Sequence, residues 1–113
     1  MAETPEGKVK RWLYGTTQNP GRLLKLFPGA YVYKPPGGMF GQAGAPDCFL
    51  LWRGVFLGLE VKTEGKVATE LQLKRLRIIS AQGGVGAVIA GRDERKLMLI
   101  YAAVMDKVER YGT

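Results

Sequence analysis

The sequence predicts an α/β fold in which helices flank a mixed β-sheet, and three observations support this prediction. Segments with helical and strand-like patterns alternate along the chain. Two strand-like runs, residues 48–52 and 55–62, are separated only by Arg53-Gly54 and predict a hairpin, whereas a helical segment precedes the next run at 86–90. With 113 residues, 46% of them apolar, the chain has the size of one domain spanning residues 1–113.

A helix is predicted near the start of the chain. Thr4-Pro5 is a typical helix start, with threonine as the N-cap and proline at the first helical position. Apolar residues then recur at helical spacing, including Val9 and Leu13. The glycine- and proline-containing segment 15–20 should end this helix.

Three further segments precede the hairpin. Residues 22–27 favour a second short helical turn, and the alternating aromatics of 30–34 favour a strand. Residues 35–46 are rich in glycine and proline and predict a mobile loop. This loop lacks the Gly-Lys-Ser/Thr ending of a phosphate-binding loop, so no nucleotide cofactor is expected.

The rest of the chain returns to the sheet and ends in a helix. Residues 63–68 predict a polar loop, and 69–82 predict a helix stopped by Gly83-Gly84. Residues 86–90 predict a strand, and 93–111 are helical by pattern, in one piece or two. The predicted order is therefore αβββαβ with a C-terminal helix.

The composition limits the possible functions. A net charge of +7 favours a polyanionic partner, with nucleic acid ahead of an anionic membrane surface or a basic surface that only aids solubility. No apolar stretch reaches the roughly 18 residues of a membrane span. With no histidine and only one cysteine, histidine-based hydrolysis and zinc sites are excluded. We expect a cytoplasmic protein, located in the host cytoplasm if phage-encoded.

Three polar residues of the hairpin point to one another. Successive strand residues alternate faces, so Glu60 and Lys62 share a face about 6.6–7 Å apart, and Gly58 leaves space beside them. Asp47 begins the partner strand and should converge on Glu60. Two carboxylates repel unless a cation lies between them, and oxygen ligands suit Mg²⁺ or Mn²⁺. Lys62 would orient a water molecule, which predicts phosphodiester hydrolysis.

These residues resemble a known nuclease motif. Pro46-Asp47, followed by Glu60-Val61-Lys62, resembles the PD-(D/E)xK nuclease superfamily. More narrowly, the chain resembles the stand-alone, phage-like form of the virus-type replication-repair nuclease (VRR-NUC) domain. The stretches that carry this resemblance are TPEGKVK at 4–10, GQAGAPD at 41–47, LEVKT at 59–63 and ELQLKRL at 70–76.

The resemblance implies a role for each matching residue. Asp47 and Glu60 would bind the metal, together with the backbone carbonyl of Val61, and Lys62 would activate water. Glu6 matches the helix glutamate of the family and would join the metal site directly or through water. Gln72 matches the family's glutamine after the lysine motif.

Each of the last two residues also has a structural explanation. Glu6 suits the first turn of a helix, where the dipole favours a carboxylate. Its spacing from Val9 and Leu13 nevertheless predicts an inward position, which favours a functional role. Gln72 would complete a capping box with Thr69, and this role competes with one at the site for the same side-chain amide.

The predicted function is a metal-dependent endodeoxyribonuclease acting as a homodimer on branched DNA such as Holliday (four-way) junctions. A small domain covers little DNA, and two subunits would suit a symmetric substrate. Flap or single-strand cleavage, a non-catalytic DNA-binding module and a basic RNA-binding or ribosome-associated protein are the alternatives. The candidate phosphate contacts are the basic residues nearest the site in sequence: Lys8, Lys10, Arg11, Lys66, Lys74, Arg75 and Arg77.

Overall fold

The computed structural model describes residues 3–36 and 41–111. The helices and strands in this part are α1 (Pro5–Tyr14), α2 (Arg22–Leu26), β1 (Tyr31–Tyr33), β2 (Cys48–Trp52), β3 (Val55–Lys62), α3 (Glu70–Ala81), β4 (Val85–Ala90) and α4 (Glu94–Tyr111). The predicted α/β order is confirmed, and the predicted helical turn at 22–27 forms the second helix, α2, which ends at Leu26. The final helix is continuous, so its division into two pieces is wrong, because its buried residues keep helical spacing throughout.

The four strands form one mixed sheet in the order β1-β2-β3-β4. The first three are antiparallel neighbours, whereas β4 runs parallel to β3. A parallel neighbour needs a crossover connection, which α3 provides. The β2–β3 turn has positive φ at both Arg53 (51°) and Gly54 (82°), as in the type I′ turns that favour tight hairpins. This register pairs Cys48 with Leu59 and so brings Asp47 to the end of the strand pair beside Glu60.

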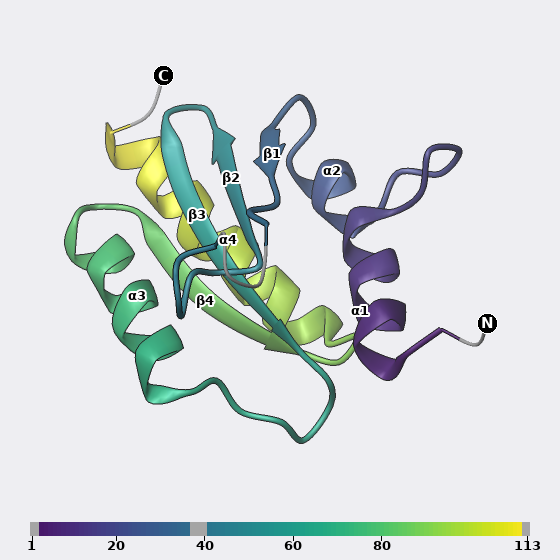
Figure 1. Cartoon of the computed structure of the whole chain (residues 1–113). Helices are drawn as coiled ribbons and strands as arrows, with labels where there is room; N and C mark the ends of the chain where they lie inside the picture. Colours follow the sequence, from purple (N-terminus) through teal and green to yellow (C-terminus); the bar gives the residue numbers. More distant parts are fainter. Residues whose placement is uncertain (1–2, 37–40, 112–113) are drawn as a thin grey trace.

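The two faces of the sheet are covered differently (Figure 1). Helices α1, α2 and α4 pack on one face, where they enclose the hydrophobic core with the inward residues of the strands. Helix α3 lies on the opposite face and contacts β3 and β4. No helix within residues 3–36 and 41–111 is long and apolar enough to cross a membrane.

Helix α3 approaches the sheet closely because two glycines face it. A Cβ at Gly58 would collide with Ile79 of α3, and one at Gly86 would collide with the Leu76 carbonyl. The space at Gly58, which we expected to lie beside the polar residues, is therefore filled by helix packing. This packing brings the first turn of α3 towards the carboxylate of Glu60 on β3.

The predicted loop between β1 and β2 has no helix or strand at residues 35–36 or 41–46. Residues 37–40 of the predicted loop lie outside the described residues. Its final segment leads into β2 through the buried Pro46, so Asp47 follows directly from the loop.

Candidate active site

Asp47 is held at the start of β2 by the neighbouring strand. Its Oδ2 atom accepts a hydrogen bond of 2.7 Å from the backbone N–H of Val61. A charge-assisted hydrogen bond of this kind fixes the position of a carboxylate. The Oδ1 atom remains directed to other groups, and the predicted convergence of Asp47 on β3 is present in the structure.

Glu60 is almost completely buried, with a relative exposure of 3%. Its Oε2 atom accepts a hydrogen bond of 3.0 Å from Gln72 Nε2 and lies 3.5 Å from Lys62 Nζ. The other oxygen, Oε1, is buried and has no hydrogen-bond partner among the described residues. A buried carboxylate oxygen without a partner is costly, so this atom suits a ligand that would complete its environment.

The electrostatics of Glu60 also indicate an incomplete site. Burial and the nearby Asp47 carboxylate raise the pKa of Glu60 from its ordinary value of 4.5 to about 7, and Lys62 only partly opposes this rise. Two neighbouring carboxylates repel each other when both are ionised, and the burial of Glu60 adds to the cost of its charge. A cation between them would remove the repulsion and favour the ionised form of both.

The side chain of Gln72 takes part in the capping box of α3 and also contacts Glu60. Its Oε1 accepts from the backbone N–H of Thr69 at 2.8 Å, and the Thr69 hydroxyl accepts from the backbone N–H of Gln72 at 3.2 Å, which completes the capping box. The Nε2 group at the other end of the amide donates to Glu60. The two roles use different ends of one side chain, so the cap itself aims the amide at the site.

Glu6 is not directed inward as the helical spacing predicts. Its side chain is 48% exposed, and Oε2 lies 3.3 Å from Lys10 Nζ. Glu6 lies in the first turn of α1, before the first buried residue, Val9, so no core contact holds it inward. It is linked to the site through Lys10, whose Nζ also lies 3.4 Å from Asp47 Oδ1.

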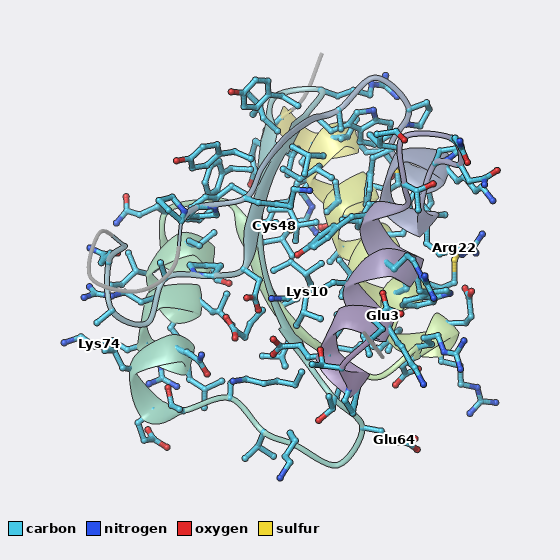
Figure 2. The ribbon with its side chains drawn as sticks, turned by 45° about the vertical axis from the view of Figure 1, so that its right-hand side comes forward. Glu3, Lys10, Arg22, Cys48, Glu64 and Lys74 are labelled. Carbon is cyan, nitrogen blue, oxygen red and sulfur yellow. The ribbon has the colours of Figure 1, made fainter. Side chains whose placement is uncertain are left out.

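Lys10 extends from α1 into the space between that helix and the sheet, whereas Lys74 lies on α3 and points outward (Figure 2). The sequence predicted Lys10 as a phosphate contact but gave no sign of its contact with Asp47. The Glu6–Lys10 spacing of four residues is typical of a helical ion pair. The Asp47 contact depends on how α1 packs against the sheet, and no local pattern encodes that placement.

The other predicted phosphate contacts fall into two groups. Arg11 forms an ion pair with Glu3 at 2.9 Å, and Arg75 Nε donates to the Ala43 carbonyl at 3.3 Å. These two side chains therefore have structural partners. The remaining four are exposed to solvent, namely Lys8, Lys66, Lys74 and Arg77.

The donor set fits a hard divalent cation that keeps part of its water shell. Asp47 and Glu60 supply carboxylate oxygens, and Glu60 Oε1 is an unpartnered buried atom. Within the described residues, no three or more His, Cys, Asp or Glu side chains gather closely enough to hold a metal by themselves. Mg²⁺ is commonly held by one or two carboxylates together with waters and substrate phosphates, so this smaller set is sufficient for it.

The cysteine beside Asp47 has no comparable role. Cys48 is fully buried, and this burial raises the pKa of its thiol to about 11. A thiol with so high a pKa is protonated at neutral pH and is a weak nucleophile. The chemistry of the site therefore rests on carboxylates and lysine.

Comparisons with known sequences give one partial match. No protein-family model matches the chain. Over 55 residues it is 36% identical to the large ribosomal subunit protein bL25 of Bacillus caldolyticus, a stretch covering 48% of this chain and 93% of that protein. This match relates about half of the chain to that ribosomal protein.

Two solved structures are similar over nearly the whole chain. A "VRR_NUC domain protein" covers 94% of this chain and 92% of its own, with a TM-score of 0.60 and 20% identity. A "VRR_NUC domain" covers 96% of this chain and 98% of its own, with a TM-score of 0.59 and 25% identity. The mixed sheet, its flanking helices and the C-terminal helix all lie within this likeness. The chain therefore has the α/β nuclease fold of these VRR_NUC domains.

Proposed function

We propose that this chain is a Mg²⁺- or Mn²⁺-dependent endodeoxyribonuclease that hydrolyses phosphodiester bonds in branched DNA. The observation that carries the proposal is the convergence of Asp47, Glu60 and Lys62, with one buried oxygen of Glu60 unpartnered. A module that only binds DNA gains nothing from paired carboxylates facing a polyanion. The nuclease fold of the family supports the same conclusion.

Each residue of the site has a specific task in this proposal. Asp47, Glu60 and the Val61 carbonyl would hold the cation, which supplies positive charge to stabilise the extra negative charge of the transition state. The backbone N–H of Val61 fixes Asp47, and Gln72 fixes Glu60. Lys62, with a side chain only 18% exposed, would hold and orient the attacking water.

The charge of the remaining surface supports DNA as the substrate. The chain carries a net charge of +7 although its candidate site is locally acidic. Exposed cations bind phosphates by releasing counterions, without reading bases. We therefore favour recognition of DNA shape, with four-way junctions ahead of flaps or single strands, by a cytoplasmic homodimer.

The decisive experiment is a cleavage assay on a labelled four-way junction beside matched duplex and flap DNA, with Mg²⁺, Mn²⁺ or EDTA. We expect metal-dependent cutting of the junction, and a loss of at least about a thousandfold in Lys62→Ala, because an oriented nucleophile is removed. Lys25→Ala is the matched control, since Lys25 is an exposed lysine of α2 outside the site.

The outcome depends on both the metal and the variant. Cleavage that persists in Lys62→Ala, with unfolding curves unchanged, would contradict the assigned mechanism. Tight junction binding without cutting under any metal would favour the non-catalytic module. Sedimentation velocity at the assay concentration tests whether the protein is a homodimer. A monomer that cuts flaps but not junctions would favour the alternative hypothesis of a flap nuclease.

A second candidate function is RNA binding, favoured by the sequence match to bL25. That protein is named as part of the large ribosomal subunit, and about half of this chain is related to it. The same assay with a structured RNA of equal length tests this candidate. RNA bound more tightly than DNA at equal salt, with no hydrolysis of either, would favour it over the nuclease.

A further inference from the structure

Lys10 occupies a position that the proposed reaction does not require. It comes from α1, on the core side of the sheet, yet its Nζ atom lies 3.4 Å from Asp47 Oδ1 and 3.3 Å from Glu6 Oε2. Asp47 Oδ2 is already engaged by the Val61 N–H. The ammonium group of Lys10 therefore pairs with the carboxylate oxygen that remains available for a cation.

The charge on Lys10 is well maintained in this position. Partial burial lowers its pKa, but the carboxylates of Asp47 and Glu6 outweigh burial and raise the pKa above its ordinary value of 10.5. Lys10 is thus fully positive at neutral pH. A positive group beside Asp47 reduces the repulsion between Asp47 and Glu60 in the metal-free protein.

The two lysines of the site differ in how firmly they are held. Lys62 projects from the end of the inner strand β3, and its side chain is 18% exposed, whereas the side chain of Lys10 is 34% exposed. The second partner of Lys10, Glu6, is itself half exposed, and pairs of that kind are weak. Lys10 can therefore leave Asp47 at much lower cost than Lys62 can leave Glu60.

We propose that Lys10 is a tethered counter-ion, which pairs with Asp47 in the metal-free protein and moves to a DNA phosphate when DNA and the divalent cation bind. This inference rests on the proposed function, because it takes Asp47 as a metal ligand. Lys10 is then a positioning residue that couples the two binding events. It competes with the metal when DNA is absent and is drawn away when a phosphate arrives.

This coupling has a thermodynamic consequence. If DNA removes a competing cation from Asp47, DNA must strengthen metal binding, and the metal must strengthen DNA binding by the same factor. Without Lys10, the metal no longer competes with a built-in positive charge, so its affinity in the absence of DNA should rise. A lysine that served only as a phosphate contact would leave metal affinity nearly unchanged.

The test is calorimetric titration of Mn²⁺ into the DNA-free protein, comparing wild type, Lys10→Met and Lys8→Met. Lys8 is the matched control because it lies on the same helix, is exposed, and loses the same charge. We expect Lys10→Met to bind Mn²⁺ about tenfold more tightly than wild type, equivalent to about 1.4 kcal/mol. Lys8→Met should change the affinity by less than about twofold, because solvent screens an exposed charge.

A second titration tests the coupling to DNA without cleavage. In the inactive Lys62→Ala background, a four-way junction should strengthen Mn²⁺ binding more than it does in the Lys62→Ala/Lys10→Met double variant. Equal strengthening in both backgrounds, or unchanged Mn²⁺ affinity in Lys10→Met, would overturn the role of Lys10. If wild type cleaves DNA with Mn²⁺ while Lys10→Met shows no gain in affinity, only this inference fails. If wild type neither binds Mn²⁺ nor cleaves, the proposed function fails with it.

A stability measurement gives a third readout. In EDTA, Lys10→Met should have a lower free energy of unfolding than Lys8→Met, because Asp47 and Glu60 lose their positive neighbour. Saturating Mn²⁺ should remove most of this difference. A Lys10→Met protein as stable in EDTA as the control would contradict the pairing with Asp47.

Discussion

The two faces of strand β3 differ in what they contribute to the protein. Val55, Leu57, Leu59 and Val61 point to one side and are buried in the core beneath α1, α2 and α4. The other side, which faces α3, carries Phe56, Gly58, Glu60 and Lys62, and its residues become more polar along the strand towards the candidate site. One strand of eight residues thus supplies hydrophobic stabilisation on one face and candidate chemistry on the other.

The difference shows how the fold supports an unfavourable arrangement of charges. On the site face a carboxylate is buried with one oxygen unpartnered, which lowers stability. On the core face the apolar side chains are close to fully buried and offset that cost. Mutations on the two faces should therefore separate stability from activity.

The largest stability effect is expected on the core face, from Leu57→Ala. Leu57 is fully buried, so its truncation should lower the free energy of unfolding by about 2–5 kcal/mol. Cleavage per folded molecule should stay near the wild-type value, because Leu57 points away from the carboxylates. Urea denaturation and the cleavage assay, both at a temperature where the variant is folded, measure the two quantities.

Phe56→Ala is the comparison from the opposite face. Because Phe56 is 41% exposed, its truncation should lower the free energy of unfolding by less than the truncation of Leu57, although the side chain of Phe56 is larger. A larger loss of stability in Phe56→Ala than in Leu57→Ala would contradict the division between the two faces.

The hairpin and its polar residues could be predicted from the sequence because their signals are local. Alternation along 55–62 and the Arg53-Gly54 turn determine which residues share a face, and therefore place Glu60 beside Asp47. The helix ends could be predicted equally well, since caps such as Thr4 and Thr69 depend on neighbouring residues.

The contacts that depend on helix placement could not be predicted in the same way. The exposed position of Glu6 and the Lys10–Asp47 pair follow from how α1 packs on the sheet. The contact of Gln72 with Glu60 requires the close approach of α3 at Gly58. Helical periodicity indicates which face of a helix is buried, but not which strand residue it meets.

The next largest expected effect is a pH dependence of the free energy of unfolding, caused by the titration of Glu60. Its pKa is raised from 4.5 to about 7 in the metal-free protein, so folding favours the protonated form. The contribution of protonated Glu60 to the stability of the folded protein is complete below about pH 4.5 and is lost as the pH rises to about 7. Relative to Glu60→Gln, wild type in EDTA should therefore lose up to about 3 kcal/mol of unfolding free energy across this range.

Urea denaturation of both proteins at several pH values measures this difference. Glu60→Gln is the appropriate reference because it keeps the size of the side chain but cannot titrate. Saturating Mn²⁺ should suppress the loss in wild type, since a bound cation favours the ionised carboxylate. A difference that grows in favour of wild type as the pH rises would contradict the assigned direction of the pKa shift.

The smallest effects separate the two roles of Gln72. Thr69→Ala removes the hydroxyl that accepts from the backbone N–H of Gln72, but leaves the amide free to contact Glu60. This variant should lose about 1 kcal/mol of stability with little change in cleavage. Gln72→Glu keeps an oxygen for the Thr69 N–H but replaces the donor to Glu60 with a negative charge.

Gln72→Glu should therefore lose less than about 1 kcal/mol of stability, while its cleavage rate at pH 7 falls about tenfold and recovers partly at higher Mn²⁺. The recovery distinguishes a site effect from a folding effect, because excess metal can offset repulsion between carboxylates but cannot restore a helix cap. Thr69→Ala should thus lower mainly stability and Gln72→Glu mainly the cleavage rate. Leu57→Ala and Lys62→Ala should separate the two quantities on the two faces of β3 in the same way. If Thr69→Ala lowered cleavage as much as Gln72→Glu, the capping box itself would be what positions Glu60, and the amide contact would be secondary.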